Sequence, residues 1–321
     1  MVVSVSRFDS WPIARRWAVG LWSAVTLGYC LSRGIPFDRA SQLLIIISAA
    51  LAFSVGTTTR AGRVFADWIP FFALLYGYDY SRGAADSLGF PVRVKELYNI
   101  EISLFGWLTD EKTPTNYLQH SLYNPAHIAW WESLVALMYC SHFVVPWTIV
   151  GVLYVRNRTR WAMFARRIIT MSLAALVTYI VVPAAPPWYA AKVGLGDPVV
   201  RAATRGWSNL GLPIAHQIIS LGQGVVNQVA ALPSLHAGTT VTISLFFWPR
   251  VRNIVRVGLV AYMSFMTFTL VFGGEHYLFD AVLGAVYAVI VEIGCRLWER
   301  RKLRPEIVGA GHQLHGKHKA D

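Results

Sequence analysis

Residues 255–296 read VRVGLVAYMSFMTFTLVFGGEHYLFDAVLGAVYAVIVEIGCR, two apolar runs separated by the short segment GGEH. Each run, over residues 255–273 and 277–296, is close to the roughly 20 residues that an α-helix needs to cross a bilayer core. Similar apolar runs recur along the chain, and only 14% of its 321 residues are charged, against about 25% in a soluble domain. The sequence therefore predicts an all-α, polytopic helix bundle in a membrane.

We predict about eight transmembrane helices, and the basic residues indicate how they are oriented. The predicted spans lie near residues 15–32, 41–56, 64–80, 127–155, 165–185, 233–249, 255–273 and 277–296. Of the 29 Lys and Arg residues, 20 lie in the N-terminal segment, the C-terminal tail and the loops that would share their side of the membrane. The positive-inside rule places that side, with both termini, in the cytoplasm.

The chain divides into three predicted regions. Residues 1–126 hold the N-terminal spans and an outer-face loop with an interfacial helix near 92–108, residues 127–298 form the catalytic membrane core, and residues 299–321 are a disordered cytoplasmic tail. The net charge of +12 suits contacts with anionic lipid, because the arginines flank spans and form no single patch for nucleic acid. All three cysteines lie in apolar runs, which predicts neither a disulfide framework nor a metal site.

Two polar clusters lie where predicted spans begin. They are PSLHAG at 233–238 and GGEHYLFD at 273–280. The orientation derived from the Lys and Arg residues alone puts both clusters at the same outer face. Ionisable residues within spans are costly, so their presence at one membrane face indicates a functional site.

The spacing within these clusters is suited to phosphoryl transfer. Ser234 lies in the first turn of the predicted helix, where backbone N–H groups and the helix dipole favour a phosphate. His276 and Asp280 share one helix face, so the carboxylate can hold one imidazole nitrogen and leave the other to attack. The second imidazole, His236, could protonate the departing alkoxide.

Structural explanations of the same residues leave a non-enzymatic alternative open. Ser234 could be only a helix cap, and His276 with Asp280 could be a structural pair. A proton-coupled transporter could use His142, His276 and Asp280 as a relay, although the Pro and Gly clusters lie outside the spans and do not break them.

Two further polar residues lie in the fourth predicted span. His142 is midway through it, at a depth where we expect a hydrogen-bonded core histidine or, as the alternative, a part of the substrate cavity. Glu132 is nearer the outer face and could line the entry to that cavity.

The two clusters resemble the second and third signature motifs of the type 2 phosphatidic acid phosphatase superfamily. Within it, the chain more closely resembles the inositolphosphotransferase branch, which includes fungal inositol phosphorylceramide synthase. That branch has a Pro-rich segment similar to AAPPW at 184–188 and, more loosely, a stretch similar to PTNYLQ at 114–119. The resemblance is strong over residues 179–295.

The resemblance implies a lipid phosphotransferase that needs no metal or other cofactor and works at the extracytoplasmic face, which we expect to be that of the cell membrane. Its substrate would be a membrane phospholipid or a polyprenyl- or sphingolipid-type lipid. It implies that His276 forms a phosphohistidine, that Asp280 orients it and that His236 is the acid. Ser234 and the backbone near Gly238 would hold phosphate oxygens. A lipid phosphate phosphatase, with water as the acceptor, shares the first step and is the alternative.

One departure from the superfamily concerns its first motif, a Lys followed about seven residues later by Arg-Pro. Lys192 is followed by Arg201 at a different spacing and without the proline. Phosphoryl transfer still requires cations that stabilise the developing charge. The outer-face candidates for phosphate binding are therefore Lys192, Arg201, Arg205 and Arg82.

Overall fold

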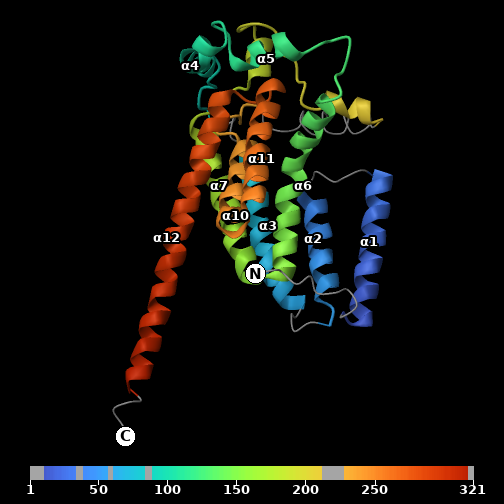
Figure 1. Ribbon diagram of the computed structural model, residues 1–321, viewed down its shortest axis with the longest axis vertical. Coiled ribbons are helices and arrows are strands. Elements are labelled where there is room, and N and C mark those ends of the chain that lie inside the picture. The colour runs from blue at the N-terminus through green and yellow to red at the C-terminus, as the bar shows by residue number, and fades with distance from the viewer. Residues whose placement is uncertain (1–10, 34–38, 57–60, 84–88, 212–227, 317–321) are drawn as a thin grey trace.

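The chain is helical almost throughout the part that the computed structural model describes, which is residues 11–33, 39–56, 61–83, 89–211 and 228–316 (Figure 1). The helices at the predicted spans are α1 (Ile13–Arg33), α2 (Arg39–Ser54), α3 (Ala61–Gly83), α6 (Glu132–Arg156), α7 (Arg158–Val181), α10 (Leu235–Phe247), α11 (Asn253–Phe272) and α12 (Leu278–Gly316). Short helices between them are α4 (Lys95–Phe105), η3 (Gly106–Leu108), α5 (Pro114–Leu122), α8 (Pro187–Lys192), η4 (Arg205–Leu210) and η5 (Trp248–Arg250). Extended pairing in the described residues is limited to isolated bridges, which confirms the all-α prediction.

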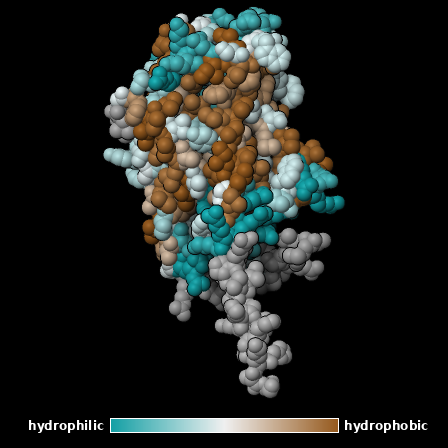
Figure 2. All heavy atoms as spheres, turned by 90° about the vertical axis from the view of Figure 1, so that its left-hand side faces the viewer, coloured by the Kyte–Doolittle hydropathy of each residue, from teal (hydrophilic) through white to brown (hydrophobic). Residues whose placement is uncertain are grey.

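Within the residues that the structure describes, four helices are long and apolar enough to cross a membrane, namely α6, α7, α11 and the first part of α12, Leu278–Lys302. On the face that carries α12, a hydrophobic band lies between hydrophilic zones (Figure 2). Exposed Val282, Val286 and Ile290 of α12 contribute apolar surface of this kind. The chain is therefore a helical membrane protein, while the count of eight spans and the cytoplasmic position of both termini remain predictions.

α10 is shorter than the span predicted at 233–249. It has 13 residues, which at 1.5 Å per residue is about 20 Å and falls short of the roughly 30 Å of a bilayer core. At its N-terminus, Ser234 is the N-cap and accepts a hydrogen bond from the Ala237 amide at 3.4 Å. At its C-terminus, the helix gives way to the 3-10 turn η5, which contains Pro249. Because Ser234 is fully buried, α10 begins inside the protein.

Two other helix boundaries differ from the prediction. α7 begins at Arg158, before the predicted residue 165, because the Asn157 side chain caps it by accepting a hydrogen bond from the Arg160 amide at 2.9 Å. α12 continues as a helix to Gly316, where the sequence predicts a disordered tail from residue 299. The Glu, Arg, Lys and Leu residues at 299–304 are strong helix formers, which explains the continuation.

Two glycines bring α10 and α12 into backbone contact. A Cβ atom at Gly284 would lie 2.3 Å from the Ser234 carbonyl oxygen, and one at Gly238 would lie 2.2 Å from Met171 Cε and 3.0 Å from the Gly284 oxygen. Neither position has room for a larger side chain. This close approach allows the Ser234 amide to donate to the Asp280 carbonyl oxygen at 3.0 Å.

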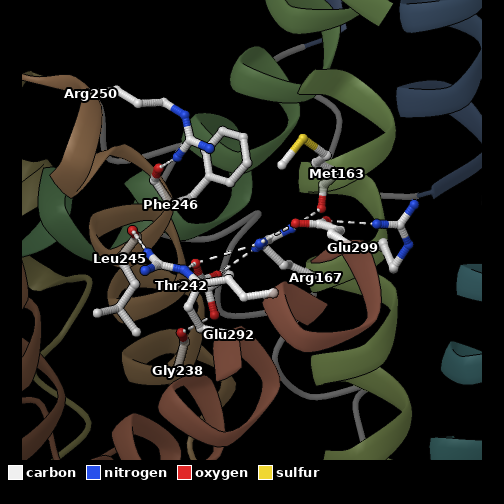
Figure 3. A network of polar contacts seen from close by, with 11 residues as sticks. Met163, Arg167, Gly238, Thr242, Leu245, Phe246, Arg250, Glu292 and Glu299 are labelled. Carbon is white, nitrogen blue, oxygen red and sulfur yellow. Dashed lines mark hydrogen bonds and ion pairs between the residues drawn. The ribbon is translucent and has the colours of Figure 1, made fainter. Parts of the chain in front are cut away.

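A buried ion-pair network fixes α12 to α7 further along its length (Figure 3). The Arg167 side chain is 1% exposed and contacts both Glu292 and Glu299. Arg296 also binds Glu292, and Arg166 binds Glu299 at 2.7 Å. α12 is thus attached to its neighbours at two places. The glycine contacts join it to α10 near its start, and the ion-pair network joins it to α7 nearer its C-terminal end.

Short helices and loops cover the end of the bundle at which α12 begins, where α4 and α5 lie (Figure 1). The interfacial helix predicted near 92–108 corresponds to α4 followed by η3, and Trp107 there is 75% exposed. Backbone bridges join Arg93 to Ala184 and Ala184 to Ala230, so three loops far apart in sequence meet beside this end.

Candidate active site

The two predicted clusters meet where α10 and α12 begin. Ser234 caps α10, and its amide donates to the Asp280 carbonyl oxygen in the first turn of α12. Since the Ser234 hydroxyl accepts its hydrogen bond from Ala237, it can still donate one to a substrate oxygen. The predicted proximity of the two motifs is therefore present in the fold.

His276 and Asp280 form the predicted pair, although His276 lies two residues before α12 begins and not on the helix itself. His276 Nδ1 lies 3.5 Å from Asp280 Oδ2, and the Tyr277 amide donates to that same oxygen at 3.0 Å. Asp280 is fully buried and His276 is 8% exposed. Because Nδ1 faces the carboxylate, Nε2 on the opposite side of the ring is the nitrogen left for a substrate.

His236 lies beside His276, with ring centroids 5.6 Å apart. Two residues of α6 pack against the His236 ring. The Tyr139 ring stacks on it, with centroids 5.0 Å apart and an interplanar angle of 19°, and the His142 ring lies with its centroid 4.0 Å away at an angle of 34°. The sequence favoured a core position for His142, remote from the chemistry, whereas the structure puts it against His236. The reason is that α10 begins deep inside the bundle, so His236 lies at the level of mid-α6.

Arg201 is a cation connected to the two histidines through their neighbours. Its guanidinium binds Glu275 through two hydrogen bonds of 3.0 and 2.8 Å, and Glu275 directly precedes His276. The guanidinium also lies 4.6 Å from the ring centroid of Trp188, in the Pro-rich segment. Tyr139 is close enough to Arg201 to interact with it electrostatically. Among the predicted phosphate-binding basic residues whose side chains the structure describes, Arg201 is the one that these contacts connect to the histidines.

Arg205 and Glu132 are paired with each other, at 2.9 Å. Arg205 also donates to the carbonyl oxygens of Asn124 and His127, and its guanidinium lies 4.3 Å from the Tyr123 ring centroid. These contacts fasten η4 to the start of α6, while phosphate binding by Arg205 and a place for Glu132 at the cavity entry remain predictions.

The remaining predicted phosphate ligands are Gly238, Lys192 and Arg82. Gly238 is a packing residue, because its amide donates to the Ser234 carbonyl oxygen at 3.0 Å and its Cα faces Met171 and Gly284. Lys192 is exposed at the end of α8. The Arg82 side chain lies outside the described residues.

Two buried polar residues at this end of the bundle were not among the predicted site residues, although Gln119 ends the PTNYLQ segment. Gln119 of α5 donates to the carbonyl oxygens of Val200 and Phe272, each at 2.7 Å. Glu101 of α4 is fully buried and accepts hydrogen bonds from the first two amides of α12. The sequence did contain an indication that Glu101 is buried. It follows Leu97 by four residues, which puts both on the same face of α4, and that face is the buried one.

Comparison with known proteins agrees with this geometry. A family model described as the PAP2 superfamily matches residues 116–293, more than half of the chain. A phosphoinositol dihydroceramide synthase from Bacteroides thetaiotaomicron is 27% identical over 267 residues, which cover 78% of this chain and 82% of that protein. No solved structure matches the chain significantly. The matched region contains both histidine clusters, Arg201 and Gln119.

Proposed function

Because the chain belongs to the PAP2 superfamily, we propose that it is a membrane lipid phosphotransferase in which His276 carries the transferred phospho-headgroup. The supporting observation is the arrangement of three side chains, with His276 Nδ1 3.5 Å from buried Asp280 and the His236 ring 5.6 Å from that of His276. The name of the relative, a phosphoinositol dihydroceramide synthase, supports a phosphatidylinositol-type donor and a ceramide-type acceptor.

The proposed reaction has two displacement steps at phosphorus. First, Nε2 of His276 attacks, the P–O bond to the lipid alcohol breaks, and His236 gives its proton to the departing alkoxide. Then the acceptor hydroxyl attacks, the P–N bond breaks, and His236 takes up the acceptor's proton. Asp280 orients His276 and stabilises its ring while it is cationic. This scheme uses only side chains of the protein and no metal ion.

Hydrolysis is the second candidate, because water could replace the acceptor in the second step. The name of the relative favours transfer, and membership of this superfamily favours an enzyme over the proton-coupled transporter. We place the reaction at the extracytoplasmic face of the cell membrane, because the Lys and Arg distribution puts both histidine clusters on that side.

The proposal is tested with purified protein in detergent, phosphatidylinositol, a fluorescent dihydroceramide and a chelator. We expect phosphoinositol dihydroceramide and diacylglycerol in equal amounts, unaffected by the chelator. Without the acceptor, slow release of inositol phosphate would reveal hydrolysis through the same intermediate. Release of inositol phosphate with no transfer product, even at saturating acceptor, would assign the phosphatase reaction. Activity lost with the chelator and restored by a metal ion would overturn the metal-independent scheme.

Substitution of Arg201 tests whether it is the phosphate clamp that replaces the missing first motif. Arg201→Ala is expected to lower kcat/KM by about 100-fold, because one charged donor to the transition state is lost. Arg201→Lys should give an intermediate loss, since Lys keeps the charge but lacks the two-pronged guanidinium. The control is Arg93→Ala, an arginine that is 44% exposed and pairs with Glu96. Unchanged kinetics in Arg201→Ala would exclude the clamp.

A further inference from the structure

Glu101 is a buried carboxylate outside the histidine site. It lies on the inner face of α4 with Leu97 and has no solvent exposure. Among the residues that the structure describes, no basic side chain forms an ion pair with it. A buried charge is costly unless hydrogen bonds compensate it, so its position calls for a specific set of partners.

Those partners are the first two backbone amides of α12. Leu278 N donates to Glu101 Oε1 at 2.7 Å, and Phe279 N donates to Glu101 Oε2 at 3.0 Å. The preceding amide, that of Tyr277, donates to Asp280 at 3.0 Å. Two carboxylates thus satisfy three consecutive N–H groups at the start of α12, where the helix dipole also favours negative charge.

We infer that Glu101 is a positioning residue, through which α4 holds the start of α12 and thereby the His276–Asp280 pair in its reactive geometry. His276 lies two residues before Leu278, and Asp280 directly follows Phe279, so both flank the amides that Glu101 anchors. A shift of about 1 Å in a reacting group can cost about 100-fold in rate. The kinetic part of this inference rests on the proposed function.

The pKa of Glu101 makes it possible to distinguish a role in positioning α12 from a role in stabilising the fold. Burial raises the pKa of Glu101 to about 7, with a further contribution from the nearby charge of Asp280, while the two amides oppose the shift. Tyr277 is also close enough to Glu101 to interact with it electrostatically. An acid whose pKa is raised on folding stabilises the fold most when protonated, and that contribution is lost as pH rises from about 4.5 to 7. A neutral side chain would therefore serve stability at least as well as the carboxylate.

The decisive variant is Glu101→Gln, because it keeps the shape and replaces one acceptor oxygen with an NH₂ group that faces a helix amide. We expect an unchanged or higher melting temperature, kcat lowered about 10-fold and KM within about 2-fold of the wild-type value. Glu101→Ala removes both acceptors and should lower kcat by about 100-fold. The matched control is Glu96→Gln on the same helix, whose carboxylate is exposed and pairs with Arg93.

A second measurement does not depend on any substrate. Exchange of the Leu278 and Phe279 amides, measured in a peptide that begins several residues before them, should be faster in Glu101→Gln than in the wild type, and unchanged in Glu96→Gln. Wild-type exchange together with wild-type kcat in Glu101→Gln would overturn the inference. If the wild type were inactive on every lipid, the proposed function would fail, and the exchange rates would still decide whether Glu101 anchors α12.

Discussion

Replacing His276 with alanine is expected to lower lipid transfer by about 10⁴-fold or more, because the variant has no group that can form the covalent intermediate. Asp280→Asn should also be severely impaired, by about 10²–10⁴-fold, since it keeps the shape but loses the charge that orients and stabilises the imidazole. With a donor labelled in its phosphate, the wild type should yield labelled protein whose label is stable in base and released by acid. That label should be missing from His276→Ala.

The matched control for this experiment is His120→Ala. His120 is an exposed histidine of α5, at the same end of the protein, and it has no place in the proposed site. It should label and react like the wild type. Normal labelling and transfer in His276→Ala would remove the nucleophile from the scheme, and the transporter alternative would then need direct measurement of flux.

The parts of this protein that could be predicted from sequence are those encoded locally. Each helix at a predicted span follows from a run of apolar residues. The pairing of His276 with Asp280 follows from their spacing of four residues, although His276 lies two residues before α12 begins. The meeting of the two histidine clusters also followed, because the count of Lys and Arg placed both at one face. α10 was predicted too long because its limits depend on the Ser234 cap and the Pro249 turn, which its apolar pattern does not reveal.

The supporting contacts could not be predicted, because each joins distant parts of the chain. Glu101 and Leu278 are 177 residues apart, and Arg201 is 74 residues from Glu275. The position of His142 against His236 depends on how deeply α10 begins within the bundle. Gly238 could not be interpreted from sequence for a related reason, because a glycine in a motif can supply either a free amide or space for a neighbouring helix. The close approach of Gly284 in the structure indicates packing.

Arg167→Met is the variant for which we expect the largest loss of stability. Two NH groups of Arg167 bind the Glu299 carboxylate at 2.8 and 3.1 Å, and its Nε binds Glu292 (Figure 3). Breaking a buried ion pair leaves carboxylates without their partner, at a cost of about 3–5 kcal/mol. Arg296 and Arg166 remain as partners of Glu292 and Glu299, so we expect the lower value, about 3 kcal/mol, and a fall of at least about 5 °C in melting temperature.

Comparing Arg167→Met with the double variant Arg167→Met/Glu292→Gln distinguishes the stability lost through an unpaired charge from the stability lost through poorer packing. If the cost of Arg167→Met comes mainly from the buried carboxylates, removing the Glu292 charge as well should restore part of the melting temperature. Activity at a temperature where both variants are folded should stay near that of the wild type, because Glu292 lies 12 residues along α12 from Asp280, about 18 Å. A wild-type melting temperature in Arg167→Met would show that Arg166 and Arg296 alone suffice to neutralise the two glutamates. The attachment of α12 to its neighbours would then rest on the Gly238–Gly284 contact and the Glu101 cap.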